Sequence, residues 1–511
     1  MNIKEYQNKV KGCWLGKNIG GTLGAPFECI RGMVDIDFYT QDMSNGAAPN
    51  DDLDLQLVWL NAAEKYGKNV NSEILAEYWI SYVVANWSEY GAGKNNAAMG
   101  ITPPLSGWYN NHNRHSCGAF IRSELWACLM PGHPELAVKY AYEDASVDHF
   151  GEGLYGELFT AAIESAAFTE TDTNKLIDIG LSYIPSDCGI ANAVKIARDC
   201  YNSGIDYKEA RKRILRAEPC SFGMYSGYTI CEPEDDIPVG TLGYDAPANI
   251  GITIMGWLYG EGDFGKSICI AAGCCEDGDC TAATLGSIMG IIMGADKLPE
   301  KWTKPIGDEI KTISLDCTAG ELLKIPNKVS ELASRVCRLM PVFMGEYCDI
   351  TAENGPELEF SEILSNDDIH DTLHACVHKR YFNTYDKTPA FSKETTALKT
   401  TVSFPDGINI AAETPIRLEL KFENLLVKQQ WLSVRVFMPD DWECSAGRKF
   451  ALNLDQIHGG YGYEKANITI TPHSISEPIT TVVFEISSNG RLSKLYLPVS
   501  LINNPQQMRK S

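Results

Sequence analysis

The segment GCWLGKNIGGTLGAPFE, residues 12–28, decides the fold because its glycines recur at every fourth position. A spacing of four places residues on one face of a helix, so this face is a stripe of glycines. Residues 281–294 carry a second stripe, made of Ala282, Gly286, Gly290 and Gly294. Glycine inside a helix costs about 1 kcal/mol relative to alanine, so both stripes need a compensating contact. Small residues allow backbones to approach closely, and we expect the two helices to lie at the domain centre, touching each other or common neighbours.

Helical periodicity extends on both sides of these stripes. From residue 4 to about residue 344, apolar residues recur at intervals of three and four, and strict alternation is nearly absent. The pattern predicts an all-α domain over residues 1–345. Within it, single amphipathic helices are predicted at residues 72–87, 153–168, 173–183, 190–202 and 207–216.

Alternation of apolar and polar residues takes over near residue 396. Residues 416–423 alternate in this way, which is typical of a half-buried strand. Residues 432–438, 481–487 and 492–499 look alike, and Asn489-Gly490 is a hairpin turn signal. We predict a small β-sandwich over residues 390–511. Residues 346–389 are predicted to be a linker that packs on one or both domains.

The composition and net charge exclude some classes of binding partner. The 511 residues include 44 Lys and Arg against 67 Asp and Glu, a net charge of −23. Such a chain repels phosphate backbones and anionic membrane surfaces, so we expect no nucleic acid and no membrane as partners. No apolar run approaches the roughly 20 residues of a membrane span, and the first residues lack the apolar core of a signal peptide. The 17 cysteines lack the even spacing of a disulfide framework, which favours a reducing, cytoplasmic location.

Acidic residues stand at the starts of two predicted helices. One cluster is Asn50, Asp51 and Asp52, and the other includes Asp277 and Asp279. Each alone is explained by capping, because acids in a first turn complement the helix dipole. Capping needs only one acid, however, whereas paired carboxylate oxygens are what Mg²⁺ or Mn²⁺ binds. Without a cation, four carboxylates in one pocket would repel and protonate, so the pattern indicates a binuclear metal site.

Four segments together resemble the ADP-ribosylglycohydrolase family, which includes the dinitrogenase-reductase-activating glycohydrolases. They are GCWLGKNIGGTLGAPFE (12–28), NDDLDLQLVWL (50–60), DHFGEGLYGELFTAA (148–162) and EDGDCTAATLGSIMGIIMGADKLPEKW (276–302). The resemblance runs from about residue 10 to residue 341. It implies an all-α orthogonal helical bundle with two Mg²⁺ ions. These ions hold a ribose diol while water cleaves the bond at the anomeric carbon, often an N-glycosidic bond to a side chain.

The resemblance also implies a role for individual residues. The glutamate after the Gly-Ala-Pro turn falls on Glu28, which with Asp279 is the expected catalytic pair. The family's Thr-His pair falls on Asp148 and His149. The expected metal ligands are Asn50, Asp51, Asp52, Asp277, Asp279, Cys280 and Thr281.

The sequence departs from the family pattern at four positions. Asn50, Cys280 and Asp148 each replace a threonine, and Gly21 stands where an aspartate is usual. Asparagine still offers Mg²⁺ a carbonyl oxygen. A thiol is a poor Mg²⁺ ligand, so three alternatives are open at Cys280. Water fills the coordination place, or Thr281 substitutes, or the site takes a softer ion such as Mn²⁺ or Zn²⁺.

An aromatic segment lies between the two acidic clusters. Trp87, Tyr90 and Trp126 interleave there with Asn, Gly and Pro, a composition that suits a sugar-stacking pocket, although Trp87 and Trp126 also fit a core. Arg122 is either a substrate clamp or a buried partner of Glu124 or another acid. The expected substrate-binding residues are Ser106, Gly107, Trp108, Tyr109, Gly118, Arg122 and His149.

The function predicted from these features is metal-dependent glycoside hydrolysis. The enzyme would cleave a ribosyl-like N- or O-glycosidic bond with metal-bound water, using two Mg²⁺ ions or Mn²⁺ or another divalent ion. Two alternatives remain: a true ADP-ribosyl-protein hydrolase, and a non-catalytic sugar-binding relative. The partner is a small-molecule glycoside or an ADP-ribosylated substrate. The sequence does not set the oligomeric state.

Overall fold

The structure is a computed structural model of the chain. It describes residues 1–223, 234, 236–315, 323–349, 357–358, 390–426, 428–456, 462–492 and 494–503. The chain divides into two compact units, one up to residue 377 and one from residue 378 onwards, and each is described by itself. Most of the linker predicted at residues 346–389 lies outside the described residues, so its bounds and those of the domains stay predictions.

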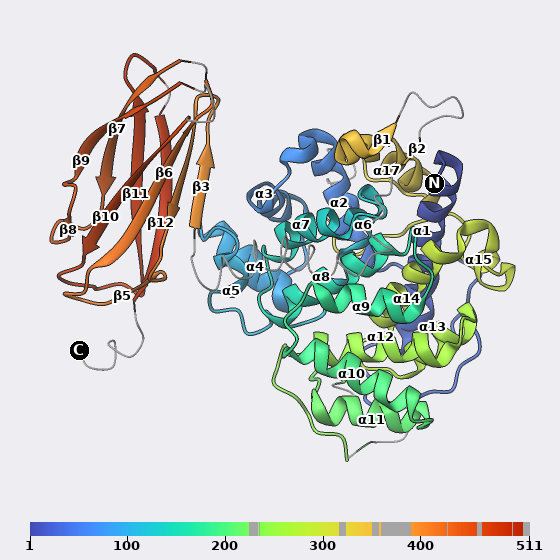
Figure 1. Cartoon of the computed structure of the whole chain (residues 1–511). Helices are drawn as coiled ribbons and strands as arrows, with labels where there is room; N and C mark the ends of the chain where they lie inside the picture. Colours follow the sequence, from blue (N-terminus) through green and yellow to red (C-terminus); the bar gives the residue numbers. More distant parts are fainter. Residues whose placement is uncertain are drawn as a thin grey trace. The chain divides into compact units, whose positions relative to one another are not determined.

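The first unit is helical, as predicted (Figure 1). Its α-helices are α1 (Ile3–Gly24), α2 (Asp51–Tyr66), α3 (Ser72–Tyr82), α4 (Ser88–Ala98), α5 (Leu105–Trp108), α6 (Glu124–Leu129), α7 (Pro134–Ala145), α8 (Glu152–Ala166), α9 (Thr173–Ser182), α10 (Gly189–Asn202), α11 (Tyr207–Ala217), α12 (Ala246–Gly260), α13 (Phe264–Gly273), α14 (Gly278–Met293), α15 (Glu300–Ile306) and α17 (Val329–Met344). Short 3-10 turns are η1 (Ala25–Phe27), η2 (Gly67–Asn69), η3 (Phe120–Arg122), η4 (Ala295–Lys297) and η5 (Gly345–Tyr347). A two-stranded ladder pairs β1 (Cys348–Asp349) with β2 (Glu357–Leu358).

One predicted helix is wrong. Residues 72–87 are not a single helix, because α3 ends at Tyr82 and α4 begins at Ser88. Between them, Val83 forms a bridge with Leu315 and the backbone N–H of Val84 donates to the carbonyl of Ser314 at 2.9 Å. Hydrogen bonds to a distant segment therefore replace the helical bonds at this point. The other four helices agree with α8 to α11 within two residues at each end.

Helices α1 and α14 touch along their small-residue stripes, as predicted. A Cβ atom placed on Gly16 would lie 1.9 Å from the carbonyl oxygen of Gly286, and one on Gly12 would lie 2.2 Å from that of Gly290. A side chain does not fit at either position. The helices run antiparallel, since Gly12 faces Gly290 at one end while Gly24 faces Gly278 at the other. The end of α1 therefore lies beside the start of α14.

The second unit is a β-sandwich whose two layers are coloured orange to red in Figure 1. Its strands are β3 (Ala390–Glu394), β4 (Leu398–Ser403), β5 (Asn409–Ile410), β6 (Ile416–Asn424), β7 (Gln430–Phe437), β8 (Glu443–Cys444), β9 (Lys449–Leu454), β10 (Tyr463–Thr471), β11 (Ile479–Ser488) and β12 (Lys494–Asn503). The sheet orders are β3-β4-β6-β10-β8 and β5-β12-β11-β7-β9. Inward residues of both sheets, such as Leu420 and Phe484, share one apolar core. The predicted hairpin at Asn489-Gly490 joins the antiparallel β11 and β12.

Within the described part of the chain, no helix is both long enough and apolar enough to cross a bilayer.

The contact between α1 and α14 gives a stability test. Alanine has the higher helix propensity, yet Gly16→Ala should lower the free energy of unfolding by about 2 kcal/mol or more, because its Cβ forces two backbones apart. Lys11→Ala, at an exposed position of the same helix, is the control and should change it by less than about 0.5 kcal/mol. Denaturant unfolding of both variants measures this. Equal stability of Gly16→Ala and wild type would contradict the tight contact.

Candidate metal centre

At the start of α2, the capping residue is Asn50 and not one of the acids. The side-chain oxygen of Asn50 accepts a hydrogen bond from the backbone N–H of Asp52 at 2.8 Å, which caps the helix. Asp51 and Asp52 are therefore not needed as caps. Asp51 Oδ2 accepts a hydrogen bond from the hydroxyl of Tyr90 at 3.2 Å, and Asp52 is buried with 1 % of its surface exposed.

The start of α14 is not capped by its acids. Asp277 occupies the N-cap position, but its side chain makes no cap hydrogen bond. Neither of its carboxylate oxygens has a hydrogen-bonded N–H or hydroxyl partner among the described residues, and the same holds for Oδ1 of Asp279. Asp277 is 1 % exposed and Asp279 is 5 % exposed. Because buried polar groups are normally satisfied, helix capping does not explain these two side chains.

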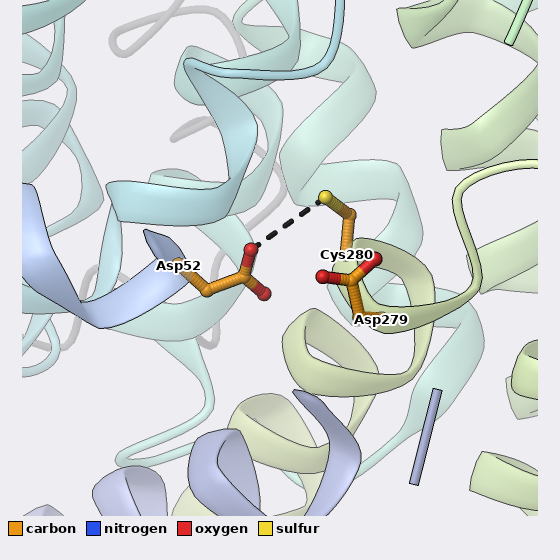
Figure 2. A group of neighbouring side chains, drawn as sticks. All are labelled: Asp52, Asp279 and Cys280. Atoms are coloured by element: carbon orange, nitrogen blue, oxygen red, sulfur yellow. Dashed lines mark hydrogen bonds between the residues drawn. The ribbon is translucent and has the colours of Figure 1, made fainter. Parts of the chain in front are cut away.

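Three ligand atoms from the two clusters converge. Oxygens of Asp52 and Asp279 and the sulfur of Cys280 all lie within 4.8 Å of one another. Figure 2 shows these three side chains pointing toward one another. The thiol of Cys280 donates to Asp52 Oδ1 at 3.6 Å. Asp52 at the start of α2 and Cys280 at the start of α14 thus meet although they are 228 positions apart in the sequence.

Electrostatics of the cluster reflect buried like charges. Burial, followed by the charges of Glu28 and Asp51, raises the pKa of Asp279 to about 8. Burial and the charge of Asp279 raise the pKa of Asp277 well above its ordinary range. The pKa of Asp52 is also raised, by burial and by Asp279, although Lys17 acts in the opposite direction. Unpartnered, mutually repelling carboxylates are the donor set that a divalent cation would stabilise, so the residues present fit such an ion.

Glu28 differs from the four aspartates because it lies at the surface. It follows η1 at the end of α1 and is an exposed residue. Partial desolvation of its carboxyl group, followed by the charges of Asp51 and Asp52, raises its pKa to about 7. The structure therefore brings an accessible acid to the edge of the buried cluster.

Two departures from the family pattern are coupled in space. A Cβ atom on Gly21 would lie 2.1 Å from the side-chain nitrogen of Asn50. The amide of Asn50 thus occupies the space that a side chain at position 21 would need. Asparagine at position 50 and glycine at position 21 are one structural feature rather than two.

Lys17 is a buried ammonium beside the cluster. Its Nζ lies 2.8 Å from Glu124 Oε1 and 3.6 Å from Asp52 Oδ2, and it donates to the carbonyl of Ile121 at 2.6 Å. Burial alone would lower the pKa of Lys17, but Glu124 and Asp52 raise it above its ordinary value. The side chain therefore compensates negative charge behind the site, where a buried acid would otherwise be unpaired.

Two further acids of the same segments have structural partners. Asp54 Oδ2 accepts hydrogen bonds from the backbone N–H groups of Ile313 and Ser314 at 2.8 and 2.6 Å. Glu276 pairs with Arg31 and lies 3.5 Å from Arg211 Nη2. These acids fix loops around the cluster. Each has one hydrogen-bonded oxygen, whereas neither oxygen of Asp277 has an N–H or hydroxyl partner among the described residues.

Arg122 is a buried partner of acids, which is the second of the two alternatives predicted for it. Its side chain is fully buried, with Nε 2.8 Å from Asp144 Oδ1 and Nη2 2.6 Å from Asp148 Oδ1. Its guanidinium also stacks on Trp79, 4.9 Å from the ring centre. The partners are Asp144 and Asp148 rather than Glu124. Burial alone would raise the pKa of Asp148, but Arg122 and His149 lower it below its ordinary value.

Other residues predicted to bind substrate form a support around His149. His149 Nδ1 lies 2.8 Å from Asp148 Oδ1, and its Nε2 lies 3.8 Å from Glu89 Oε1. Ser106 donates to the carbonyl of Val147, and a Cβ on Gly107 would collide with the carbonyl of His149.

Gly118 belongs to the same support. Its N–H donates to Glu89 Oε1 at 3.1 Å, and a Cβ atom there would lie 2.8 Å from the ring of Tyr90. The support thus reaches the acids through Tyr90, which bonds Asp51. A role in substrate binding stays a prediction for each of these residues.

The aromatic residues divide into core and surface. Trp126 is fully buried and donates its N–H to Asp144 at 2.9 Å, so it is a core residue. Trp87 is 48 % exposed and stacks on Tyr90 at 6.3 Å between ring centres. Trp108 and Tyr109, which are among the residues predicted to bind substrate, are half-buried at the end of α5. Among the aromatics, Tyr90 is the one whose described contacts reach the acids, and Trp87 is stacked on it.

Sequence reasoning missed Lys17 and Glu89. Lys17 follows Gly16 in a stretch of α1 whose residues are all buried. A charged side chain at such a position requires a buried acid as its partner. Glu89 lies in the aromatic segment, but its contact with His149 joins residues 60 positions apart. Local spacing carries no information on such a contact.

A family match covers most of the helical unit. The model of the family described as ADP-ribosylglycohydrolase matches residues 2–337, so the chain belongs to the ADP-ribosylglycohydrolase family. The family consists generally of hydrolases, is typically metal-dependent and acts on ADP-ribosylated substrates. A solved structure described as an "ADP-ribosylglycohydrolase-related protein complex" is 18% identical and covers 66% of this chain and 99% of its own, with a TM-score of 0.43. No curated protein matches the chain.

Removal of the buried ammonium should destabilise the protein. Lys17→Met leaves Glu124 without its cation, so we expect the free energy of unfolding to fall by about 3–5 kcal/mol. Adding Glu124→Gln in the same chain should recover part of this loss. Lys11→Met on the exposed face of α1 is the matched control. Denaturant unfolding at neutral pH measures all three, and an undiminished stability of Lys17→Met would contradict the ion pair.

The raised pKa of Asp279 predicts how stability depends on pH in the presence of chelator. The folded chain holds this proton up to about pH 8, whereas an unfolded aspartate releases it near pH 4. The folded state therefore binds more protons in this window, and its stability falls as pH rises from about 4 to 8. In Asp279→Asn the fall in melting temperature should be shallower. The exposed variant Asp296→Asn should follow wild type, and an equally steep fall in Asp279→Asn would contradict the assignment.

Proposed function

We propose that this protein is a metal-dependent glycoside hydrolase that cleaves a ribosyl-like N- or O-glycosidic bond. One observation carries the proposal: in a chain that belongs to a hydrolase family, buried oxygens of Asp277 and Asp279 have no N–H or hydroxyl partner among the described residues, and Asp279 converges with Asp52. Hydrolysis needs water to be activated at a place where the sugar is also held. A cluster of unpartnered acids at an accessible edge provides that combination.

The residues divide into ion-holding and proton-transferring groups. Asp51, Asp52, Asp277 and Asp279 would hold divalent ions. When bound, the ions supply Lewis acidity that activates water and orients sugar hydroxyls. Glu28 is the accessible carboxyl at the edge of the cluster. We assign to it the transfer of a proton between water, or the leaving group, and the solvent, the task of a general acid or base.

The described cations favour a neutral glycoside over a pyrophosphate. Four buried basic residues lie in the described segments around the acids, and each is engaged by carboxylates: Lys17, Arg31, Arg122 and Arg211. None of the four is available to neutralise a phosphate. Trp87, exposed and stacked on Tyr90, supplies an aromatic surface on which a sugar ring packs.

The second candidate is hydrolysis of ADP-ribosyl groups on proteins. Family membership favours it, because the family acts on ADP-ribosylated substrates. The two candidates differ in product. The second requires release of free ADP-ribose from a modified protein, whereas the first gives a free sugar from a neutral riboside or aryl glycoside.

Turnover and metal binding together test the proposal. Asp277→Asn should lose both the thermal stabilisation by Mg²⁺ or Mn²⁺ and the turnover. That stabilisation is about 2.7 kcal/mol at an ion concentration 100 times the dissociation constant. Glu28→Gln should keep the stabilisation and lose about 10²-fold or more in kcat. Glu73→Gln, at an exposed position of α3, is the control.

The substrates are ribosides, nucleosides, aryl glycosides and ADP-ribosylated protein, each with divalent ion or chelator. Turnover of the neutral substrates supports the first candidate, and release of ADP-ribose alone supports the second. A chain that is stabilised by a sugar but turns over none of these substrates is a binding protein, and the proposal then falls.

A further inference from the structure

The position of Cys280 carries an inference about which ion the cluster selects, and it rests on the function proposed above. Cys280 is buried, and its sulfur is one of the three ligand atoms that converge with Asp52 and Asp279 (Figure 2). Its side chain thus points into the cluster. The sulfur stands among the atoms that would surround an ion.

Thr281 is held by backbone contacts. Its hydroxyl donates to the carbonyls of Gly278 at 3.1 Å and Ala271 at 3.4 Å, and the side chain is fully buried. These bonds use the hydroxyl hydrogen and leave the oxygen lone pairs, so Thr281 stays one of the three alternatives. The choice of ion is therefore inferred from Cys280, whose sulfur lies among the acids.

The spacing of the donor atoms fits a thiolate-binding ion. Sulfur and oxygen bonded at about 2.3 and 2.1 Å to tetrahedral Zn²⁺ lie about 3.6 Å apart. The Sγ of Cys280 lies 3.6 Å from Asp52 Oδ1.

The unpartnered acids supply the remaining donors. Both oxygens of Asp277 and Oδ1 of Asp279 are buried without an N–H or hydroxyl partner among the described residues. The thiols of Cys280 and Cys117 act on Asp277 and lower its pKa, against the larger effect of burial. A thiol is a weak donor without a charge, so these carboxylates still lack a cation. Two or three carboxylates with one thiolate form a mixed oxygen and sulfur set, which zinc-class ions bind more tightly than Mg²⁺ does.

We propose that this cluster takes a thiolate-accepting transition-metal ion of the zinc class in preference to Mg²⁺, with Cys280 as the residue that sets the preference. Coordination displaces the thiol proton to solvent and ends the hydrogen bond from Cys280 to Asp52. Asp52, Asp277 and Asp279 are the oxygen donors from which the remaining ligands come.

Co²⁺ is the spectroscopic probe, because a thiolate bound to Co²⁺ gives a charge-transfer absorption that oxygen ligands do not. The full-length protein, reduced and treated with chelator, is titrated to one equivalent of Co²⁺. Wild type should show the band, and Cys280→Ser should lack it. Cys269→Ser removes another buried cysteine, on α13, and should retain the band. A band of equal strength in Cys280→Ser overturns the proposal.

Competition between ions gives a second readout. By calorimetric titration, Cys280→Thr should lower the ratio of Zn²⁺ to Mg²⁺ affinity by about tenfold or more, with Mg²⁺ affinity unchanged or increased. An unchanged ratio overturns the proposal. The outcomes remain distinct from those of the proposed function. Turnover with Mg²⁺ and no Co²⁺ band refutes only the ion preference, whereas a band without any turnover supports the ion preference and refutes the hydrolase.

Discussion

The site depends on one contact, the backbone approach between α1 and α14. Glycines on both helices face carbonyl oxygens of the other at distances that exclude any side chain. Because the helices run antiparallel, this contact fixes the end of α1, which leads to Glu28, beside the start of α14, which carries Asp277 and Asp279. Helical glycine is costly by itself, so the contact offsets a local penalty with tertiary packing. Glycines, which have no side chains, thus set the positions of Glu28, Asp277 and Asp279.

Charge compensation is the second constraint, and it is asymmetric. Behind the site, buried acids are paired: Glu124 with Lys17, Asp148 with Arg122, and Glu276 with Arg31. At the site itself, the carboxylate of Asp277 has no basic side chain as a hydrogen-bonded partner among the described residues. Burying an unpaired charge costs several kcal/mol. The buried basic side chains pair most closely with acids outside the site, and the acids of the site repel one another. Protonation or an ion resolves the repulsion that results.

The sequence predicted the periodic features well. The glycine stripes predicted the α1–α14 contact, and alternation predicted the strands of the sandwich, because both are local patterns with a fixed spacing. The break between α3 and α4 was missed, since it is made by hydrogen bonds from Val84 to Ser314. The partners of Arg122 and the whole role of Lys17 were also beyond local pattern, because they join segments that only the folded chain brings together. Which oxygens lack partners is likewise a property of the fold.

The pair of Gly21 and Asn50 restricts how this chain could have changed over time. With the amide nitrogen of Asn50 in place, even a methyl group at position 21 collides with it. A larger residue at position 21 therefore requires the amide of Asn50 to turn away, or a shorter residue at position 50. Turning the amide also disturbs the bond by which Asn50 caps α2. Replacing position 50 first avoids the collision, so one order of the two substitutions is easier than the other.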